Sequence, residues 1–308
     1  MFALFLVEKV SLLRKRFFIG NPFLLVNLLK ESFCCINMIF THILIRAGEL
    51  FLKGKNAPMF EHKLVDNAKK ITGVSSIMRL RGRFLSHYFE NHHSLTKVFG
   101  IVSYSPAVRV EKNLDDIQTK ALELLSGLNG TFKIEPKRSD KRFPLTSPEI
   151  NIVMGKYIEE HTSLKFDGLH PDHLLGVEIN QEGAYLFLEI IPCFGGLPTG
   201  VEGRVMVLLE NEASILAGLL LMKRGCDIVP VAFSLFDISL LQQYSPQKLE
   251  LSLIQSLDEI SARGMEVVVS GQCFDDYKKY DTHLTVLRPL IHYNEEEVRK
   301  QLDGFRRG

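Results

Sequence analysis

Hydrophobic and polar residues follow a helix-like or a strand-like period along most of the chain after residue 37. An apolar run over 39–45 predicts a strand, and apolar residues at helical spacing predict a helix over 57–73. Pro58 near the start of that segment and Gly73 at its end are typical of helix boundaries. Residues 75–89 return to a strand pattern. This order, with a further strand behind it, predicts a small ferredoxin-like unit.

The next part of the chain also mixes helices with strands. A helix is predicted over 113–127, because Asn113 is a suitable N-cap and acidic residues fill the first turn. Residues 131–136 predict a strand, 146–162 predict a helix with proline near its start, and 176–191 predict two strands around a turn. The N-terminal half of the protein is therefore expected to be of the α+β class.

Glycine and proline mark the next boundary. The segment 192–204 holds four glycines and two prolines, a composition typical of a connection between units. Beyond it, strand and helix patterns alternate, and this alternation predicts an α/β unit with a doubly wound parallel sheet. The expected strands are 205–209, 227–233, 266–270 and 284–287, and the expected helices are 213–224, one within 246–263, and one from Asn294 onward.

The overall composition limits the kinds of partner and the compartment. The 308 residues are 46% hydrophobic and 24% charged, with a net charge of +1, so affinity for a polyanion must come from local patches. The five cysteines are odd in number and form no C-x-x-C motif. This usage indicates a reducing compartment, and we expect a cytoplasmic protein without a disulfide framework or a zinc site.

The first 37 residues are apolar and mildly basic. Their longest charge-free apolar run, 17–29, has about 13 residues, whereas a membrane-spanning helix needs roughly 20. We therefore expect no membrane anchor. Regular patterning begins at Met38, which favours that residue as the start of translation and 1–37 as a mis-assigned or disordered extension.

Three basic clusters are candidates for contacts with phosphate. Arg79, Arg81 and Arg83 alternate, so on a single strand their guanidinium groups would share one face. The segment 133–142 carries five basic and two acidic residues, a local net charge of +3, which suits a loop that contacts phosphates. Its basic residues are Lys133, Lys137, Arg138, Lys141 and Arg142, and a weaker third group consists of Lys53 and Lys55. Since charged loops are often simply solvated, a plain surface remains an equal alternative.

Histidines and cysteines give weaker signals. No cluster of them has the spacing of a metal site, so we expect no bound metal. Cys273 follows the apolar strand 267–269, and the carboxyl ends of strands are where open α/β sheets bind ligands. A nucleophilic thiol also needs a base nearby, so Cys273 is a catalytic candidate only.

Three stretches together resemble one protein family. Residues 43–56, 195–225 and 286–298 look like the corresponding parts of the ThiI-type tRNA 4-thiouridine synthetases, in the same order along the chain. In that family two N-terminal domains hold tRNA, and a third domain uses ATP to activate a uridine oxygen so that sulfur can replace it. Some members also supply sulfur for thiamine biosynthesis.

The resemblance implies a particular division of the chain. The implied parts are a ferredoxin-like domain at 38–108, a THUMP RNA-binding domain at 109–197, and an adenylating domain of the PP-loop ATP-pyrophosphatase fold at 198–308. The basic segment 133–142 falls within the implied THUMP domain. The family's acceptor cysteine has no counterpart before residue 308, so the third domain is expected to be truncated as well as degenerate.

The phosphate-binding loop of the family, Ser-Gly-Gly-x-Asp-Ser, has lost its glycines here. The resemblance places the glycine pair on Glu210 and Asn211, the aspartate on Ala213 and the final serine on Ser214. Side chains at the glycine positions block close approach of the backbone to a phosphate, and carboxylates place like charge beside it. A later glutamine-rich segment of the family is reduced to Gln272 and its neighbours. We therefore expect a degenerate nucleotide site.

These observations favour a cytoplasmic tRNA-binding protein whose PP-loop domain has lost ATP chemistry. Such a protein is expected to serve a separate thiolation enzyme or sulfur donor, and the family precedent suggests a homodimer. Two alternatives remain open. One is an active, divergent tRNA sulfurtransferase that uses ATP and Mg²⁺ and in which Ser214, Gln272 and Cys273 act. The other is a scaffold that binds protein rather than RNA.

Overall fold

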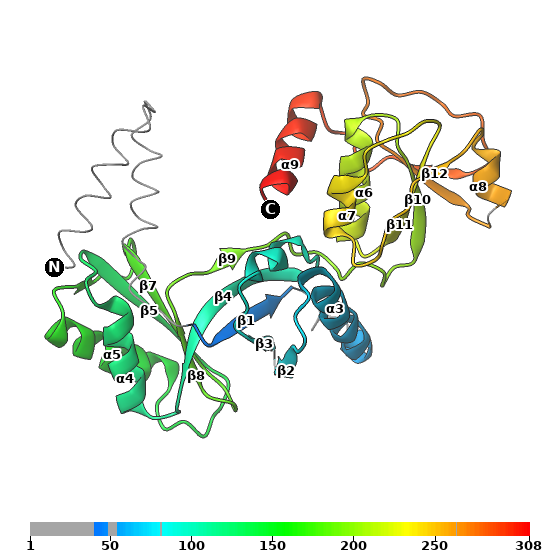
Figure 1. The fold of residues 1–308 in the computed structure, drawn as a ribbon. Coiled ribbons are helices and arrows are strands. Elements are labelled where there is room, and N and C mark those ends of the chain that lie inside the picture. The colour runs from blue at the N-terminus through cyan, green and yellow to red at the C-terminus, as the bar shows by residue number, and fades with distance from the viewer. Residues whose placement is uncertain (1–39, 49–53, 81, 263) are drawn as a thin grey trace, which may run out of the picture. The chain divides into compact units, whose positions relative to one another are not determined.

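The computed structural model of the chain describes residues 40–48, 54–80, 82–262 and 264–308 (Figure 1). The expectations for 1–37, for Lys53 and for Arg81 lie outside the described residues. Residues 40–308 form one compact unit. Within the described part of the chain, no helix combines the length and the apolar character that crossing a membrane requires.

One mixed sheet contains all the described strands up to residue 192. Its strand order is β2-β3-β1-β4-β8-β7-β5-β6, and β9 pairs with β4 beside this path. The strands are β1 (His42–Ala47), β2 (Met78–Leu80), β3 (Arg83–His87), β4 (Ile101–Val110), β5 (Thr131–Arg138), β6 (Lys165–Phe166), β7 (His173–Ile179), β8 (Ala184–Phe187) and β9 (Ile191–Pro192). The helices beside it are α3 (Ala57–Thr72), the 3₁₀ helix η2 (His92–Lys97), α4 (Leu114–Leu125) and α5 (Ser147–His161).

Strand β4 belongs to both halves of this sheet. Residues 101–107 of β4 pair antiparallel with β1, and residues 108–110 pair antiparallel with β8. We call β2-β3-β1-β4 the first half-sheet and β4-β8-β7-β5-β6 the second half-sheet. The border expected between residues 108 and 109 thus lies inside one strand, because β4 is long enough to carry two ladders in succession.

The two faces of the first half-sheet are packed differently. On one face Ile43 and Phe84 pack with Phe60 and Leu64 of α3. On the other face a smaller apolar cluster includes Leu44 and Leu85 of the first half-sheet and Tyr185 and Phe187 of the second. This second cluster joins the two half-sheets through side chains as well as through β4.

Gly176 of β7 shows why that junction is tight. A Cβ atom at this position would lie 2.1 Å from the ring of Phe187, the residue paired with Gly176 across β7 and β8. Only glycine leaves room for the ring to lie against the β7 backbone. The guanidinium carbon of Arg46 lies over the same ring, 4.8 Å from its centre.

The predicted helix ends are confirmed in this half of the chain. Asn113 accepts a hydrogen bond from the Asp116 amide at the start of α4. Thr146 and Glu149 form a reciprocal capping box at the start of α5, and Gly73 ends α3 in the left-handed conformation. These caps satisfy amide and carbonyl groups that a helix leaves unpaired at its ends.

The chain after residue 203 forms a second, all-parallel sheet, as predicted. Its order is β12-β11-β10-β13-β14, and every adjacent pair is parallel. The strands are β10 (Arg204–Leu208), β11 (Asp227–Ala232), β12 (Ser252–Leu253), β13 (Val267–Ser270) and β14 (Thr285–Leu287). The helices are α6 (Glu212–Lys223), α7 (Ser239–Tyr244), α8 (Asp258–Ala262) and α9 (Glu295–Arg307).

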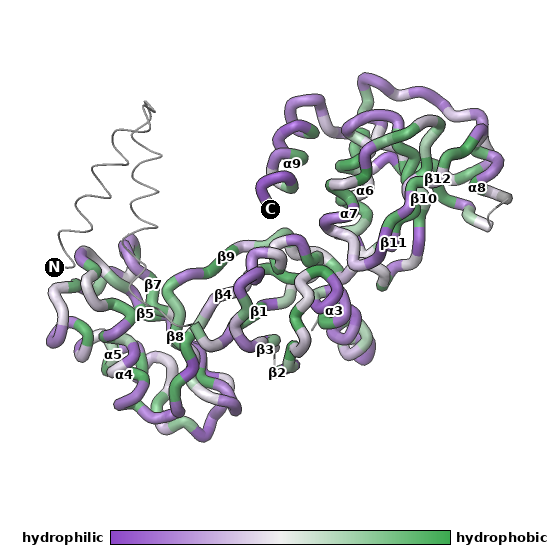
Figure 2. The backbone as a smooth tube through the Cα atoms, in the orientation of Figure 1, coloured by the Kyte–Doolittle hydropathy of each residue, from purple (hydrophilic) through white to green (hydrophobic). Residues whose placement is uncertain are grey.

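Alternation along β10 directs its side chains into two separate cores. Val205 and Val207 pack with residues of α6, α7 and α9 on one face, while Met206 and Leu208 pack with the α8 region on the other. Figure 2 shows the contrast between hydrophobic β10 and hydrophilic α9, which buries only Val298 and two further apolar residues of one stripe. Helices on both faces make this a doubly wound α/β unit.

The helix predicted within 246–263 is α8, and it covers only Asp258–Ala262. In the same stretch, Ser252–Leu253 forms the edge strand β12, which was not predicted from the sequence. The short helix α7 was not predicted from the sequence. Both of these elements are short and show no sustained period of apolar residues, so the pattern alone does not distinguish helix from loop or strand there.

Candidate functional site

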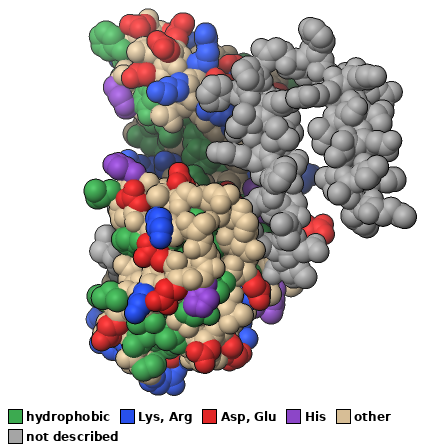
Figure 3. All heavy atoms as spheres, turned by 90° about the vertical axis from the view of Figure 1, so that its left-hand side faces the viewer, with side chains coloured by type: hydrophobic (Ala, Val, Ile, Leu, Met, Phe, Trp, Pro, Cys, Tyr) green, Lys and Arg blue, Asp and Glu red, His purple; other side chains and the backbone are tan. Residues whose placement is uncertain are grey.

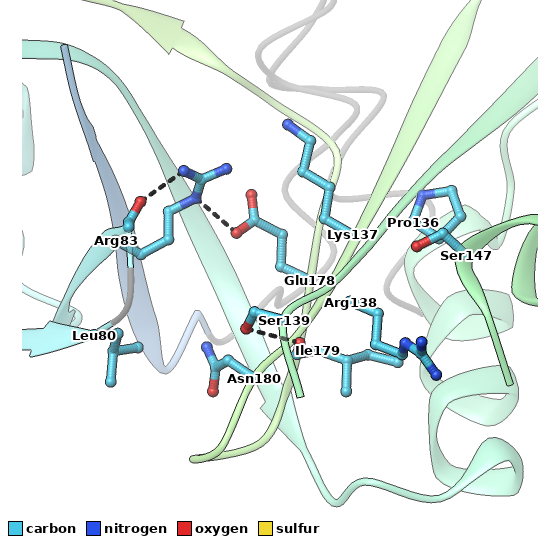
Figure 4. Close-up of a pocket in the computed structure, with 11 residues that line it drawn as sticks. Leu80, Arg83, Pro136, Lys137, Arg138, Ser139, Ser147, Glu178, Ile179 and Asn180 are labelled. Atoms are coloured by element: carbon cyan, nitrogen blue, oxygen red, sulfur yellow. Dashed lines mark hydrogen bonds and ion pairs between the residues drawn. The ribbon is translucent and has the colours of Figure 1, made fainter. Parts of the chain in front are cut away.

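A hollow lined by basic side chains lies where β3 begins and where β5 and β7 end (Figure 4). We call it the basic pocket; its volume is about 400 Å³. Three of its lining residues are basic, Arg83, Lys137 and Arg138, and one is acidic, Glu178. Ser147, the first residue of α5, also lines it. The pocket thus collects three of the residues expected to contact phosphate.

Lys137 reaches the pocket because of the strand register. It is the direct partner of Glu178 in the parallel pair of β5 and β7, and partners in a ladder share one face of the sheet. Figure 4 shows Arg83 and Lys137 on either side of Glu178. Arg138, unlike Lys137, bonds to the backbone. Its Nη1 donates to the carbonyl oxygens of Phe143 (2.9 Å) and Leu145 (3.1 Å). It therefore holds the turn before α5.

Glu178 itself is buried and bound to two arginines. Its Oε2 accepts from Nε of Arg83 at 2.9 Å, and its Oε1 accepts from Nη2 and Nε of Arg46 at 3.0 and 3.3 Å. Arg46 is also buried, donates to Ser105 Oγ at 2.9 Å, and has its pKa lowered by burial. Glu178 and Arg46 were not predicted from the sequence. The available signal was a charged residue inside an otherwise apolar strand.

Two of the other basic residues of the segment 133–142, Arg142 and Lys133, pair with acidic side chains of the same segment. Asp140 is 5% exposed and accepts hydrogen bonds from Arg142 and from Lys112, each at 2.9 Å. These bonds hold the pKa of the Asp140 carboxyl well below its usual range.

The remaining lysines of the basic groups differ in their surroundings. Nζ of Lys133 lies 3.7 Å from Oε1 of Glu135. Lys141 is exposed, as is Lys55 of the third basic group. Lys133 to Arg138 belong to β5, so only the last part of the segment is a loop.

The expectation that Arg79 and Arg83 share one face of a single strand is wrong. Gly82 has a φ of +74°, and the chain turns there to form a hairpin of β2 and β3. Arg79 pairs with Phe84 on the face that packs against α3, and its guanidinium lies 3.4 Å from Glu61 of that helix. Arg83 instead points to Glu178 on the other face. Sequence spacing alone does not reveal that a glycine ends the strand.

The loop between β10 and α6 lies at the carboxyl edge of the parallel sheet. Asn211 caps α6, and its Oδ1 accepts from the amide of Ser214 at 3.1 Å. The Ser214 hydroxyl accepts in turn from the amides of Glu210 (3.2 Å) and Asn211 (3.4 Å). Ser214 is 1% exposed, and Ala213 packs at the edge of the core. The amides of Glu210, Asn211 and Ser214 are therefore bonded within the chain.

Glu210 draws further donors to the same loop. Its carboxylate accepts from Lys278 Nζ at 3.1 Å and forms a hydrogen bond with the hydroxyl of Tyr280. Burial and this carboxylate raise the pKa of Tyr280. Behind the loop, a Cβ atom on Gly271 would lie 2.4 Å from the Ser214 amide nitrogen. The backbone after β13 thus lies directly against the start of α6.

Gln272 and Cys273 lie after β13, as predicted, but neither forms a reactive arrangement. Gln272 is 3% exposed, and its Oε1 accepts from Arg288 Nε at 3.0 Å. Burial raises the pKa of the Cys273 thiol, and Asp276, Asp275 and Glu295 raise it further. These neighbours oppose the thiolate that a nucleophile needs. Among the described residues, no group of three or more histidine, cysteine or acidic side chains is arranged to hold a metal ion.

On the face seen in Figure 3, basic and acidic side chains are interspersed. The described part of this face therefore shows no broad surface of a single charge sign. The basic pocket differs because its carboxylate is already bound by two arginines, which leaves Lys137 and part of Arg83 facing the hollow.

Comparison with known proteins identifies both halves of the mixed sheet. The model of the ThiI ferredoxin-like domain matches residues 42–105, and the model of the THUMP domain matches residues 111–189. A probable tRNA sulfurtransferase of Moorella thermoacetica is 40% identical over 211 residues, which are 65% of this chain and 54% of the relative. One of Listeria welshimeri is 38% identical over 288 residues, which are 87% of this chain and 70% of the relative.

A solved structure shows the same architecture. It is a 4-thiouridine synthetase–RNA complex with bound ATP, and it is 25% identical to this chain with a TM-score of 0.74. The match covers 86% of this chain and 85% of that one. The chain spans about half the length of several of the curated relatives it matches.

Proposed function

This chain belongs to the tRNA sulfurtransferase family, and we propose that it binds tRNA through the basic pocket while its β10–α6 loop holds no ATP. The observation that carries the proposal is a contrast between the hydrogen-bond donors of the basic pocket and those of the β10–α6 loop. Lys137 and Arg83 face a hollow of about 400 Å³. The amides of Glu210, Asn211 and Ser214, by comparison, are bonded to the side chains of Ser214 and Asn211.

The basic pocket suits a phosphate backbone for simple physical reasons. Lysine and arginine neutralise phosphates and release counterions, which supplies most of the affinity of a protein for nucleic acid. The THUMP match and the RNA in the complex of the structural neighbour support tRNA as the partner. The pocket has no exposed aromatic side chain among its described lining residues, so we propose backbone contacts rather than base stacking.

The β10–α6 loop does not fit a triphosphate. A phosphate cradle needs unpaired amides and little side-chain bulk, but here the amides of Glu210, Asn211 and Ser214 are bonded to the side chains of Ser214 and Asn211. The Glu210 carboxylate adds negative charge to the same loop, and it forms an ion pair with Lys278, whose positive charge is thereby partly neutralised. We therefore propose that adenylation of the tRNA, if this chain takes part in it, requires a second protein. That partner would be a thiolation enzyme or a sulfur donor.

Binding of tRNA is the first test. Lys137→Ala should weaken binding of bulk tRNA about tenfold and lower the slope of log K against log salt by about one, as the loss of one phosphate contact does. Lys248→Ala is the matched control, because Lys248 is an exposed lysine that already pairs with Glu250. Equal affinities for the two variants would remove the pocket from the interface. Absence of tRNA binding by the wild type would favour a protein-binding scaffold.

Pyrophosphate release from ATP with Mg²⁺ tests the second part. The wild type should give no release above a blank without protein, with or without tRNA. The relatives are named tRNA sulfurtransferases and the structural neighbour contains ATP, so an active divergent enzyme is the specific alternative. Release that tRNA stimulates and that Ser214→Ala abolishes would establish that alternative and reject the proposed loss of ATP chemistry.

A further inference from the structure

We propose that Glu178 is the positioning residue of the basic pocket, because it fixes the guanidinium of Arg83 toward the hollow while it joins β7 to β1 and β3. The inference rests on the proposed function of the pocket in RNA binding. It adds a role for an acidic residue, which simple charge arguments would class as unfavourable for binding a polyanion.

The contacts of Glu178 divide between two kinds of arginine. Arg46 is buried, and it donates twice to Oε1 of Glu178 and once to Ser105. The side chain of Arg83 is 28% exposed, and it donates to Oε2 of the same carboxylate at 2.9 Å. One buried negative charge is thus shared by two positive charges. The surplus positive charge lies on Arg83, at the wall of the pocket (Figure 4).

The geometry of Arg83 is fixed from two sides. Its Nε donates to Glu178, and its Nη1 donates to the carbonyl oxygen of Gly82 at 2.8 Å. Within the described part of the chain, no protein atom accepts a hydrogen bond from Nη2 of Arg83. A planar guanidinium held at two nitrogens presents the third in a set direction, so less side-chain freedom is lost when a phosphate binds.

Glu178→Gln separates positioning from charge, because the two effects have opposite signs. Removing a carboxylate from a basic pocket strengthens RNA binding if only charge matters. A glutamine, however, has one acceptor oxygen with two lone pairs and one donor amide, and Arg46 alone gives two hydrogen bonds to the single oxygen that it contacts. Arg46, which is buried and has no water to replace its partner, would take that oxygen. Arg83 would then be released, and we expect tRNA binding to weaken about threefold to tenfold.

A second background tests whether the effect passes through Arg83. In the Arg83→Ala variant there is no guanidinium left to position, so adding Glu178→Gln should leave affinity unchanged or strengthen it. Weakening of the same size in both backgrounds would overturn the positioning role. The matched control is Glu61→Gln, which removes the partner of exposed Arg79 and should only maintain or slightly strengthen binding.

A readout without RNA keeps this inference distinct from the proposed function. The Nε–H signal of Arg83 in a ¹⁵N NMR spectrum, assigned by its loss in Arg83→Ala, should exchange slowly with solvent in the wild type and rapidly in Glu178→Gln. Slow exchange in both proteins would overturn the positioning role even if the pocket binds tRNA. If Lys137→Ala binds tRNA normally, the proposed interface fails, while the change in Arg83 exchange still supports the positioning.

Loss of folding is controlled directly. Far-UV circular dichroism must be unchanged at the assay temperature, and Arg83→Lys provides a variant in which Glu178 and Arg46 are untouched. A lysine retains the charge but lacks the second and third nitrogens of the fork. We expect Arg83→Lys to weaken tRNA binding about threefold. Affinity equal to wild type in Arg83→Lys would show that charge alone is needed and would overturn the inference.

Discussion

Glu178 and Glu210 are two carboxylates with similar partners and opposite effects on their surroundings. Each accepts hydrogen bonds from two side chains, but the side chain of Glu178 is 6% exposed and that of Glu210 is 22% exposed. Glu178 lies behind the basic pocket and holds an arginine that still faces the hollow. Glu210 lies in the β10–α6 loop and forms an ion pair with Lys278. The position of a carboxylate therefore decides whether nearby donors remain available to a ligand.

The largest expected difference between the two carboxylates is in stability. Glu178→Ala removes the ion-pair partner of the buried Arg46, which costs about 3–5 kcal/mol of unfolding free energy. Glu210→Ala breaks a pair whose lysine, Lys278, is 62% exposed, and it should cost about 1 kcal/mol or less. Urea denaturation of both variants measures the difference. Equal losses would contradict the distinction between a buried and a surface carboxylate.

A smaller effect on stability tests whether the Ser214 side chain satisfies the backbone amides before α6. Ser214→Ala removes the acceptor of two amides and the reciprocal part of the cap, and should cost about 1–2 kcal/mol. Ser239→Ala is the control, because the Ser239 hydroxyl bonds only to the exposed Asp237 among the described residues, and it should change stability by about 0.5 kcal/mol or less. If both variants unfold at the same urea concentration as the wild type, the loop amides do not depend on Ser214.

The hairpin of β2 and β3 permits a test on RNA affinity. Arg83→Ala should weaken tRNA binding about tenfold, equivalent to about 1.4 kcal/mol, because Arg83 lines the basic pocket. Arg79→Ala should change the affinity by less than about twofold, since Arg79 lies on the α3 face and pairs with Glu61. Filter binding over a salt series compares them. Equal losses would restore the expectation of a shared arginine face.

The smallest effect is on the pH dependence of folding stability, through two histidines of the mixed sheet and its adjoining 3₁₀ helix. Burial and neighbouring positive charge lower the pKa of His42, and burial with His93 lowers that of His92. The unfolded chain therefore binds more protons as pH falls through about 6.5, so folded stability decreases there. Melting temperatures from pH 7.5 to 5.5 should fall less in a His42→Gln/His92→Gln variant. Parallel slopes would contradict these assignments.

The sequence predicted the periodic elements well because each has local signals. Asn113, Thr146 and Asn294 were placed correctly at helix starts, since a cap is a property of neighbouring residues. The parallel sheet and its carboxyl edge also followed from the alternation of strand and helix. The grouping of Glu210, Ser214 and Gln272 at that edge is what this topology produces.

The basic pocket could be predicted only in part. Lys137 and Arg138 were found from local charge, but Glu178 is separated from its partner Arg46 by 132 residues, and no sequence spacing relates the two. Arg79 and Arg83 were paired wrongly because alternation was read across Gly82. The missing information was the side-chain contact of β1 and β3 with the distant strand β7, which depends on tertiary packing rather than on propensity.

Strand β4 has a consequence for how the chain unfolds. Because residues 101–107 and 108–110 of one strand complete two successive ladders, the two regions matched by separate domain models cannot melt one after the other without breaking a shared strand. They should lose structure in a single cooperative step. The amides of β4 should be among the slowest in the protein to exchange with deuterium, and a cut within this strand should release both regions together.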